Sequence, residues 1–292
     1  MKMMHKKVAI VTGATSGIGL KTAETLTREA YTVVIACRDK QKGACLAADI
    51  LEQKGKTGSS VDVMLLDLAS LHSVRAFAET FMAKYDRLHL LVNNAGGFYD
   101  SLQRTEDGFE MTMGVNYLAP FLLTRLLLPI LKNTQGARIV NITSKAAFYA
   151  KLKLDEDVFT SHRYGFKAYA ASKLAQILFT IDLAEELKGT GVTVNAAYPG
   201  RVATNIWKGS SLLMKLVAPI MMRNSISAVE GAKPGIHLAV SPELEGITGK
   251  LFDQEGVMEY NKACLDVQRR KELMELSFAA LKRFMPLLNL NT

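Results

Sequence analysis

The sequence has few cysteines, and this limits the kinds of protein it can encode. Cys37, Cys45 and Cys264 form an odd set without C-x-x-C spacing, so they indicate neither a disulfide framework nor a zinc site. The five histidines also lack metal-ligand spacing, and no metal is expected. Free thiols are typical of a reducing compartment, so we expect a cytoplasmic protein.

Long apolar runs are absent as well. The first apolar run, V-A-I-V-T, has only five residues, fewer than the apolar stretch of a signal peptide. The most apolar later stretch, residues 121–131, carries Arg125 and Pro129 and is shorter than the ~20 residues of a membrane span. We expect no transmembrane segment, and peripheral contact with a membrane stays open.

No block of a single charge is present. The net charge is +8 and the pI is 9.3, but Lys and Arg are scattered among acidic residues. Without a basic block or a nucleic-acid motif, we expect no nucleic-acid binding, although the basic excess suits anionic phosphates. No linker, repeat or composition break divides the chain, so we expect a single domain over residues 1–292.

Runs rich in Val, Ile and Leu alternate with helix-length segments. Continuous apolar strands separated by helices indicate a parallel sheet that is covered on both faces. The sequence therefore predicts an α/β, Rossmann-type, doubly wound sheet of about seven strands. We expect these strands at residues 7–12, 31–37, 61–67, 88–93, 138–143, 192–198 and 247–252.

A glycine-rich turn, T-G-A-T-S-G-I-G at 12–19, follows the first expected strand. Glycines allow the backbone to approach a pyrophosphate, and the N-terminus of the next helix offers free N–H groups. A purely structural turn is the alternative. We predict a dinucleotide-binding loop that contains Gly13, Thr15, Ser16, Gly17, Ile18 and Gly19.

The end of the second expected strand bears on the choice of cofactor. An acidic residue there would accept the ribose 2′-hydroxyl of NAD, whereas an arginine can pair with a 2′-phosphate. Arg38 occupies this region and Lys42 follows, which favours NADP(H). Alternatively, Arg38 pairs with Asp39 or lies in solvent. Asp67 and Leu68, after the third strand, are expected near the adenine, although Asp67 could be a turn residue.

Two Tyr-x-x-x-Lys runs follow the fifth expected strand. Y-A-K-L-K at 149–153 leads into a polar stretch without an apolar face, which predicts a loop. Y-A-A-S-K at 169–173 opens a run with apolar residues at helical spacing, and Gly189 can stop that helix. A tyrosine and a lysine four residues apart on a helix lie on one face, where they can do proton chemistry.

The motifs occur in the order that is seen in the short-chain dehydrogenases/reductases, which the sequence resembles over about residues 7–252. The resemblance rests on the glycine turn, N-N-A-G (93–96), Asn116, Ser144, Y-A-A-S-K and Y-P-G (198–200). Residues 172–200 and S-P-E-L-E-G-I-T-G-K (241–250) resemble the retinol-dehydrogenase-like branch, which includes WW-domain oxidoreductases. That branch generally prefers NADP(H).

The resemblance implies a catalytic set of Asn116, Ser144, Tyr169 and Lys173. Tyr169 would be the general acid/base, with Lys173 lowering its pKa and holding the nicotinamide ribose. Ser144 would orient the carbonyl oxygen, and Asn116 would help to hold a water. Ser144 lies 25 residues before Tyr169, a separation that fits the branch. Further cofactor contacts are implied for Asn93, Ala95, Gly96, Pro199, Gly200, Val202 and Thr204.

The implied reaction interconverts a lipophilic aldehyde or ketone, retinal included, and its alcohol. Such enzymes carry a substrate lid after Y-P-G, which we place at 201–226. The alternative for its apolar residues is packing on the core or on a second copy of the chain in a homo-oligomer. Expected substrate contacts are Phe98, Phe148, Tyr149 and Trp207.

Three points stay open. The extension at 261–292 is expected to be helical and could cover the pocket, form a dimer surface or touch a membrane. The same proton donor could also serve reduction of a carbon–carbon double bond. A regulatory or scaffold protein that binds the cofactor but does little chemistry is the remaining alternative, which the intact set of four catalytic residues argues against.

Overall fold

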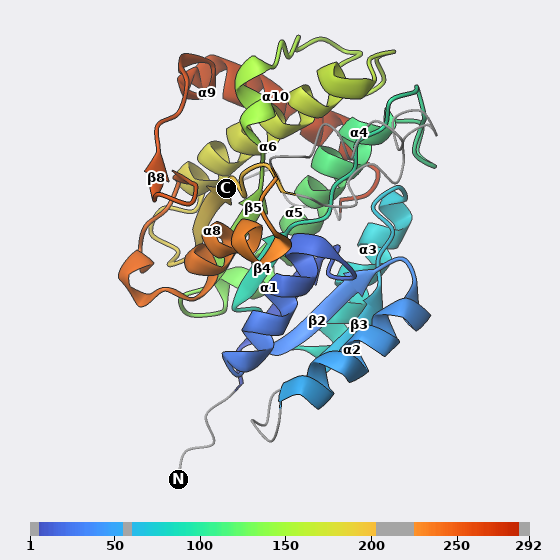
Figure 1. The fold of residues 1–292 in the computed structure, drawn as a ribbon. Coiled ribbons are helices and arrows are strands. Elements are labelled where there is room, and N and C mark those ends of the chain that lie inside the picture. The colour runs from blue at the N-terminus through green and yellow to red at the C-terminus, as the bar shows by residue number, and fades with distance from the viewer. Residues whose placement is uncertain (1–5, 55–59, 203–224, 286–292) are drawn as a thin grey trace.

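The fold is built on one eight-stranded sheet. The computed structural model describes residues 6–54, 60–202 and 225–285 (Figure 1). The strand order is β3-β2-β1-β4-β5-β6-β7-β8; β1 to β7 are parallel and β8 is antiparallel to β7. The strands are β1 (Val8–Thr12), β2 (Thr32–Cys37), β3 (Val61–Leu65), β4 (Leu90–Asn93), β5 (Arg138–Ile142), β6 (Thr193–Ala197), β7 (Leu251–Phe252) and β8 (Val257–Met258).

The predicted doubly wound α/β fold is confirmed, and one strand was missed. All seven expected strands are present, shortened by one to four residues at their ends. The eighth, β8, has two residues, of which Val257 is exposed. A strand of this length that buries little apolar surface leaves no apolar run or alternation in the sequence.

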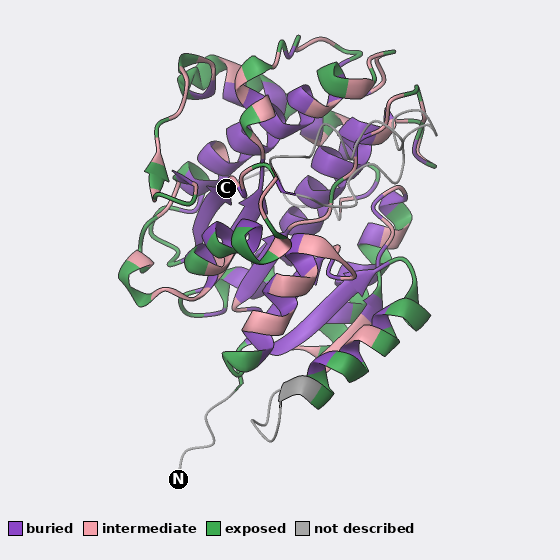
Figure 2. Cartoon of the chain, in the orientation of Figure 1, coloured by how far each residue is buried: buried purple, intermediate pink, exposed green. Residues whose placement is uncertain are grey.

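Helices cover both faces of the sheet. Side chains alternate between the faces along each strand: Val8 and Ile10 pack in a core cluster with α3, α5, α6 and α10, whereas Ala9 and Val11 pack with α1, α2 and α8. Figure 2 shows the buried residues on the strands and on the inner sides of these helices. The helices are α1 (Gly17–Arg28), α2 (Lys40–Lys54), α3 (Leu71–Lys84), α4 (Met111–Met113), α5 (Ala119–Lys132), α6 (Gly165–Glu186), α8 (Ala228–Val240), α9 (Lys262–Leu265) and α10 (Val267–Leu281).

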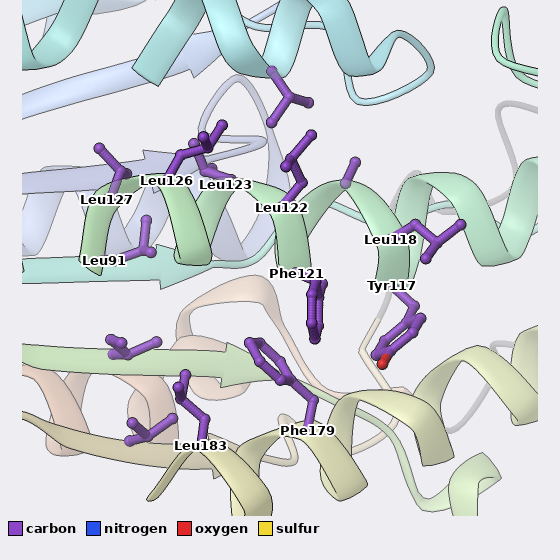
Figure 3. Packing of buried hydrophobic residues seen from close by; sticks show 14 of the residues in the cluster. Leu91, Tyr117, Leu118, Phe121, Leu122, Leu123, Leu126, Leu127, Phe179 and Leu183 are labelled. Carbon is purple, nitrogen blue, oxygen red and sulfur yellow. The ribbon is translucent and has the colours of Figure 1, made fainter. Parts of the chain in front are cut away.

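The apolar segment 121–131 belongs to a longer helix than the sequence suggested. It forms most of α5, which continues without a break from α4 through a π-helical turn, η1 (Gly114–Leu118). The combined helix, Met111–Lys132, has 22 residues and is long and apolar enough to cross a membrane, but 94% of its most apolar window is buried within the fold. Figure 3 shows Phe121 pointing toward Phe179 of α6, with the ring centroids 4.7 Å apart. The helix therefore serves as a core element.

The described part of the carboxyl-terminal extension, up to residue 285, contains helices α9 and α10, and α10 packs on α5 and α6. The ring of Phe278 meets Phe121 with the centroids 5.4 Å apart. The buried guanidinium of Arg125 lies 4.8 Å from the Phe278 ring and also pairs with Glu186 of α6. The described part of the extension thus closes the core beside α6, while residues 286–292 lie outside the described chain.

Candidate active site

The site predicted from the sequence lies at the carboxyl ends of the central strands. Strands β1 and β4 are neighbours, and the chain winds from them in opposite directions along the sheet, which makes this point the topological switch where such sheets bind ligands. The glycine turn follows β1, the N-N-A-G loop follows β4, Ser144 follows β5 and Y-P-G follows β6. All four segments therefore meet at the same edge.

The glycine turn has the geometry of a close backbone approach. Gly13 has a φ of +65° and Gly17 a φ of +57°, a region that favours glycine. A Cβ at Gly19 would lie 2.5 Å from the carbonyl oxygen of Gly13, so a side chain there would displace backbone. Helix α1 begins at Gly17 without a side-chain cap from Ser16 and without an acidic residue in its first turn. The free backbone N–H groups of its first turn can donate hydrogen bonds to an anion.

Thr12 and Asn94 brace this turn against the N-N-A-G loop. The Thr12 hydroxyl accepts hydrogen bonds from the backbone N–H groups of Asn94 and Ala95, both at 3.0 Å. The Asn94 carboxamide donates to the Thr12 carbonyl at 2.8 Å. Sequence reasoning missed both roles, because it singled out Asn93 in the Asn-Asn pair.

The side chain of Asn93 points away from the turn. It is 1% exposed and donates to Thr124 Oγ1 at 3.0 Å and to Asn141 Oδ1 at 2.9 Å. Successive residues at the end of a strand face opposite sides, so only one of two adjacent asparagines can reach the turn. The predicted cofactor contact of Asn93 is therefore limited to its backbone.

The residues expected near the adenosine half also lie at this edge. Arg38 follows β2 and is exposed, and it forms no ion pair with Asp39 in the described chain; instead, Asp39 Oδ1 accepts a hydrogen bond from Lys42 N at 2.9 Å. Asp67 Oδ1 accepts from Ala69 N at 2.9 Å, as a turn residue does. Leu68 is buried in the core, which leaves only its backbone for a cofactor.

Asn116 ties the long helix to the loop after β4. It lies on the π-helical turn η1, an irregularity that is frequent at functional sites. Its carboxamide accepts from Gly97 N at 2.8 Å and donates to Gly97 O at 3.0 Å and Ser172 Oγ at 3.1 Å. A Cβ at Gly96 would lie 3.2 Å from Asn116 Oδ1 and 3.5 Å from Lys173 Nζ. The loop, Asn116 and Lys173 thus form one contact region.

Ser144, Tyr169 and Lys173 come together as predicted. Ser144 precedes a 3₁₀ turn, η2 (Lys145–Tyr149), and its side chain lies close enough to Tyr169 to act on the pKa of that phenol. Helix α6 begins at Gly165, so Tyr169 and Lys173 lie one turn apart on it. The Lys173 ammonium lies 5.8 Å from the centroid of the Tyr169 ring.

The electrostatics of the pair differ from the expectation. Burial raises the pKa of Tyr169 to about 12; the Ser144 side chain opposes this rise, and Tyr198 adds to it. Burial also lowers the pKa of Lys173 to about 7. The expected lowering of the tyrosine pKa is therefore absent. A lysine field can act on Tyr169 only if the buried ammonium keeps its proton.

The remaining predicted contacts fall into three groups. Pro199 and Gly200, with a φ of +86°, follow β6, and Val202 packs against α1 and α8. Phe98 is buried, with its ring 5.8 Å from that of Tyr169, and Phe148 is half-buried. Tyr149 is 76% exposed and lies on the surface. Thr204, Trp207 and most of the predicted lid lie outside the described residues.

The arrangement fits a nicotinamide dinucleotide. The close-approach glycines and the uncapped helix α1 suit the pyrophosphate. Gly13, Gly17 and Gly19 would hold that group, and Gly96, in the loop after β4, lies beside Lys173.

A family model described as short chain dehydrogenase matches residues 7–213. The chain is a short-chain dehydrogenase. This short-chain dehydrogenase is 39% identical to Retinol dehydrogenase 14 of Mus musculus, over 94% of this chain and 86% of the relative. It is 44% identical to Retinol dehydrogenase 12 of Homo sapiens, over 84% of this chain and 77% of the relative. The predicted retinol-dehydrogenase-like branch is confirmed.

Solved structures agree with this family and fold. An uncharacterized protein from Mycobacterium Paratuberculosis is 30% identical, with a TM-score of 0.74 over 94% of this chain and 93% of that one. A short chain dehydrogenase from Shigella flexneri 2a str. 301, complexed with NADP, is 24% identical, with a TM-score of 0.68 over 87% and 98% of the two chains. The second likeness concerns the fold alone. The protein is thus an oxidoreductase of alcohols and carbonyls that uses a nicotinamide cofactor.

Proposed function

We propose that this short-chain dehydrogenase uses NADP(H) to interconvert a lipophilic aldehyde or ketone, such as retinal, and the corresponding alcohol. Tyr169 is the general acid/base of the reaction. The observation that carries the proposal is the position of Tyr169 on α6, with the Lys173 ammonium 5.8 Å from its ring and the Ser144 side chain close enough to oppose the rise of its pKa.

The chain supplies the proton and the groups that receive negative charge. When bound, the nicotinamide cofactor supplies a hydride to the carbonyl carbon or accepts one from the alcohol. In the reductive direction, Ser144 donates a hydrogen bond to the substrate oxygen, and Tyr169 transfers its phenolic proton there. The raised pKa of Tyr169 keeps the phenol protonated at neutral pH. In the oxidative direction, the charged Lys173 stabilises the phenolate that must form.

The walls beside Tyr169 support an apolar substrate. Phe98 lies against the Tyr169 ring, and Phe148 is half-buried on the η2 turn that Ser144 begins. Metals have no role in the proposal, and the described residues contain no cluster of His, Cys, Asp and Glu that could hold one. The names of the retinol dehydrogenase relatives are consistent with an apolar alcohol.

Two features support NADP(H) and a reducing compartment. Asp39 is engaged with the backbone of α2, so the exposed Arg38 remains to pair with a 2′-phosphate. Cys37, Cys45 and Cys264 are free thiols, which are stable in a reducing environment. A cytoplasmic location is therefore part of the proposal.

The test is oxidation of NADPH by the purified protein with a panel of apolar aldehydes and ketones, retinal included. Tyr169→Phe should lower turnover at least ~100-fold, because it removes the proton donor. Tyr149→Phe is the matched control and should retain turnover. If Tyr169→Phe keeps wild-type turnover, the assignment is wrong. Product analysis separates the reactions, since a saturated carbonyl product would indicate reduction of a carbon–carbon double bond.

A further inference from the structure

A buried glutamine contacts the proposed catalytic lysine. We propose that Gln176 is a positioning residue whose side-chain carbonyl holds the Lys173 ammonium in place beside Tyr169. The inference deepens the proposed function and rests on the roles given there to Tyr169 and Lys173. Gln176 lies three residues after Lys173, so the two side chains share one face of α6.

The contact is direct and shielded from water. Lys173 Nζ donates to Gln176 Oε1 and to the Ile142 carbonyl, both at 3.0 Å. Lys173 is 4% exposed and Gln176 is 3% exposed. The reverse orientation of the carboxamide would set an NH₂ donor against the ammonium, so chemistry requires the oxygen on the lysine side. The amide oxygen and the strand carbonyl thus fix the position of the charge.

The other half of the carboxamide shows that packing alone does not account for a glutamine here. Gln176 Nε2 is buried and has no partner among the described residues, and an unpaired buried donor costs about 1–3 kcal/mol. Methionine would fill the same volume without that penalty. The side-chain oxygen, which contacts Lys173, therefore accounts for the glutamine at this position.

Neighbouring polar groups hold Gln176 itself in place. Thr180 donates from Oγ1 to the Gln176 backbone carbonyl at 2.8 Å. Asn141 of β5 donates to the same Thr180 oxygen at 2.9 Å and accepts from Asn93 of β4. This buried polar network, formed by Gln176, Thr180, Asn141 and Asn93, links the backbone at Gln176 to the two central strands.

The titratable groups around Lys173 leave an electrostatic role for the glutamine. Tyr169 faces it from the same helix, Tyr198 lies beyond Tyr169 after β6, and Lys145 lies 5.1 Å from the Tyr198 ring. No acidic side chain of the described chain perturbs the pKa of Lys173, which burial lowers. The neutral dipoles at Gln176 Oε1 and the Ile142 carbonyl therefore favour the charged form. Their loss would release its proton at lower pH.

The test measures the pKa of Lys173 in the free protein by NMR of ¹³Cε-labelled lysine, with the resonance assigned by its absence in Lys173→Met. In Gln176→Met the pKa should fall by about 1 unit, the equivalent of one hydrogen bond to a charged group. Thr180→Val is the matched control: it removes a polar group from the same network but leaves the contact with Lys173. Gln176→Glu keeps an oxygen acceptor and should raise the pKa.

A kinetic readout accompanies the titration. The charged Lys173 stabilises the Tyr169 phenolate during alcohol oxidation, and in Gln176→Met less of this lysine keeps its proton near pH 7, so kcat/KM at that pH should fall several-fold. An unchanged pKa of Lys173 in folded Gln176→Met would overturn the inference, as would an equal fall in Thr180→Val. Should Tyr169→Phe remain active, the proposed function fails, while the NMR titration still decides the role of Gln176 toward Lys173.

Discussion

Replacing Lys173 by methionine should remove the activity together with the pH dependence of stability that this buried lysine causes. Burial lowers the pKa of this lysine from 10.5 to about 7 in the folded state. The unfolded chain therefore binds the proton more tightly between these two pH values. The sign follows: Lys173 lowers the free energy of unfolding at and below pH 7, and the penalty disappears as the pH rises toward 10.5.

The size of the effect can be worked from the same contacts. The lowered pKa corresponds to a penalty of ~4 kcal/mol at pH 7. Methionine removes this penalty but strands the Gln176 and Ile142 oxygens that accept from Lys173 Nζ, which costs about 1–3 kcal/mol for each oxygen. At pH 7 the two effects are therefore of similar size and largely offset each other. By about pH 9.5, wild type should recover ~3 kcal/mol relative to the variant.

Urea unfolding of both proteins at pH 7 and at about pH 9.5 measures this difference, in which all shared titrations cancel. Lys132→Met is the control, because the Lys132 side chain is exposed and its replacement removes no burial penalty on the charged form. The reasoning would be refuted if the stability difference between Lys173→Met and wild type were the same at both pH values.

Two further substitutions test the cofactor edge. Gly19→Ala should lower stability by ~1 kcal/mol and weaken NADPH binding at least ~10-fold, because its Cβ would lie 2.5 Å from the Gly13 carbonyl oxygen. The control is Gly235→Ala, where the new Cβ meets only one side-chain methyl, and this variant should bind NADPH normally. Fluorescence titration measures both affinities, and equal values for the two variants would contradict the account. Arg38→Asp should reduce the NADPH-to-NADH ratio of kcat/KM at least ~10-fold, whereas Arg87→Asp makes the same charge change before β4, at the opposite edge; an unchanged ratio would remove Arg38 from the 2′-phosphate site.

The sequence was sufficient to predict the architecture and the general position of the site. Seven apolar runs separated by helical segments determine a doubly wound sheet, because parallel strands buried on both faces cannot alternate with polar residues. The order of strands brings the glycine turn, Ser144 and Y-P-G to one edge. These features depend on periodicity and topology, both of which can be derived from the sequence.

Details that depend on side-chain direction were not predictable. Asn93 and Asn94 are adjacent and chemically identical, and only the register of β4 decides that Asn94 reaches the turn. Gln176 lies in a run of apolar residues. The sequence does not show which way the Lys173 side chain points, so the contact between the two side chains could not be predicted. The raised pKa of Tyr169 depends on the depth of burial, which no motif encodes.

The structure also favours the second Tyr-x-x-x-Lys run over the first for the proposed reaction. In the first, Lys153 is 74% exposed and pairs with Asp155 at 2.8 Å, and Tyr149 is exposed. A charge in water that already has a partner exerts little field on a neighbouring phenol. Lys173 has no acidic partner in the described chain and is surrounded by protein, so water screens a charge on it much less than a charge on Lys153. A site that needs this field must therefore tolerate a destabilising lysine, and a fixed acceptor such as Gln176 is what keeps the proton on it near neutral pH.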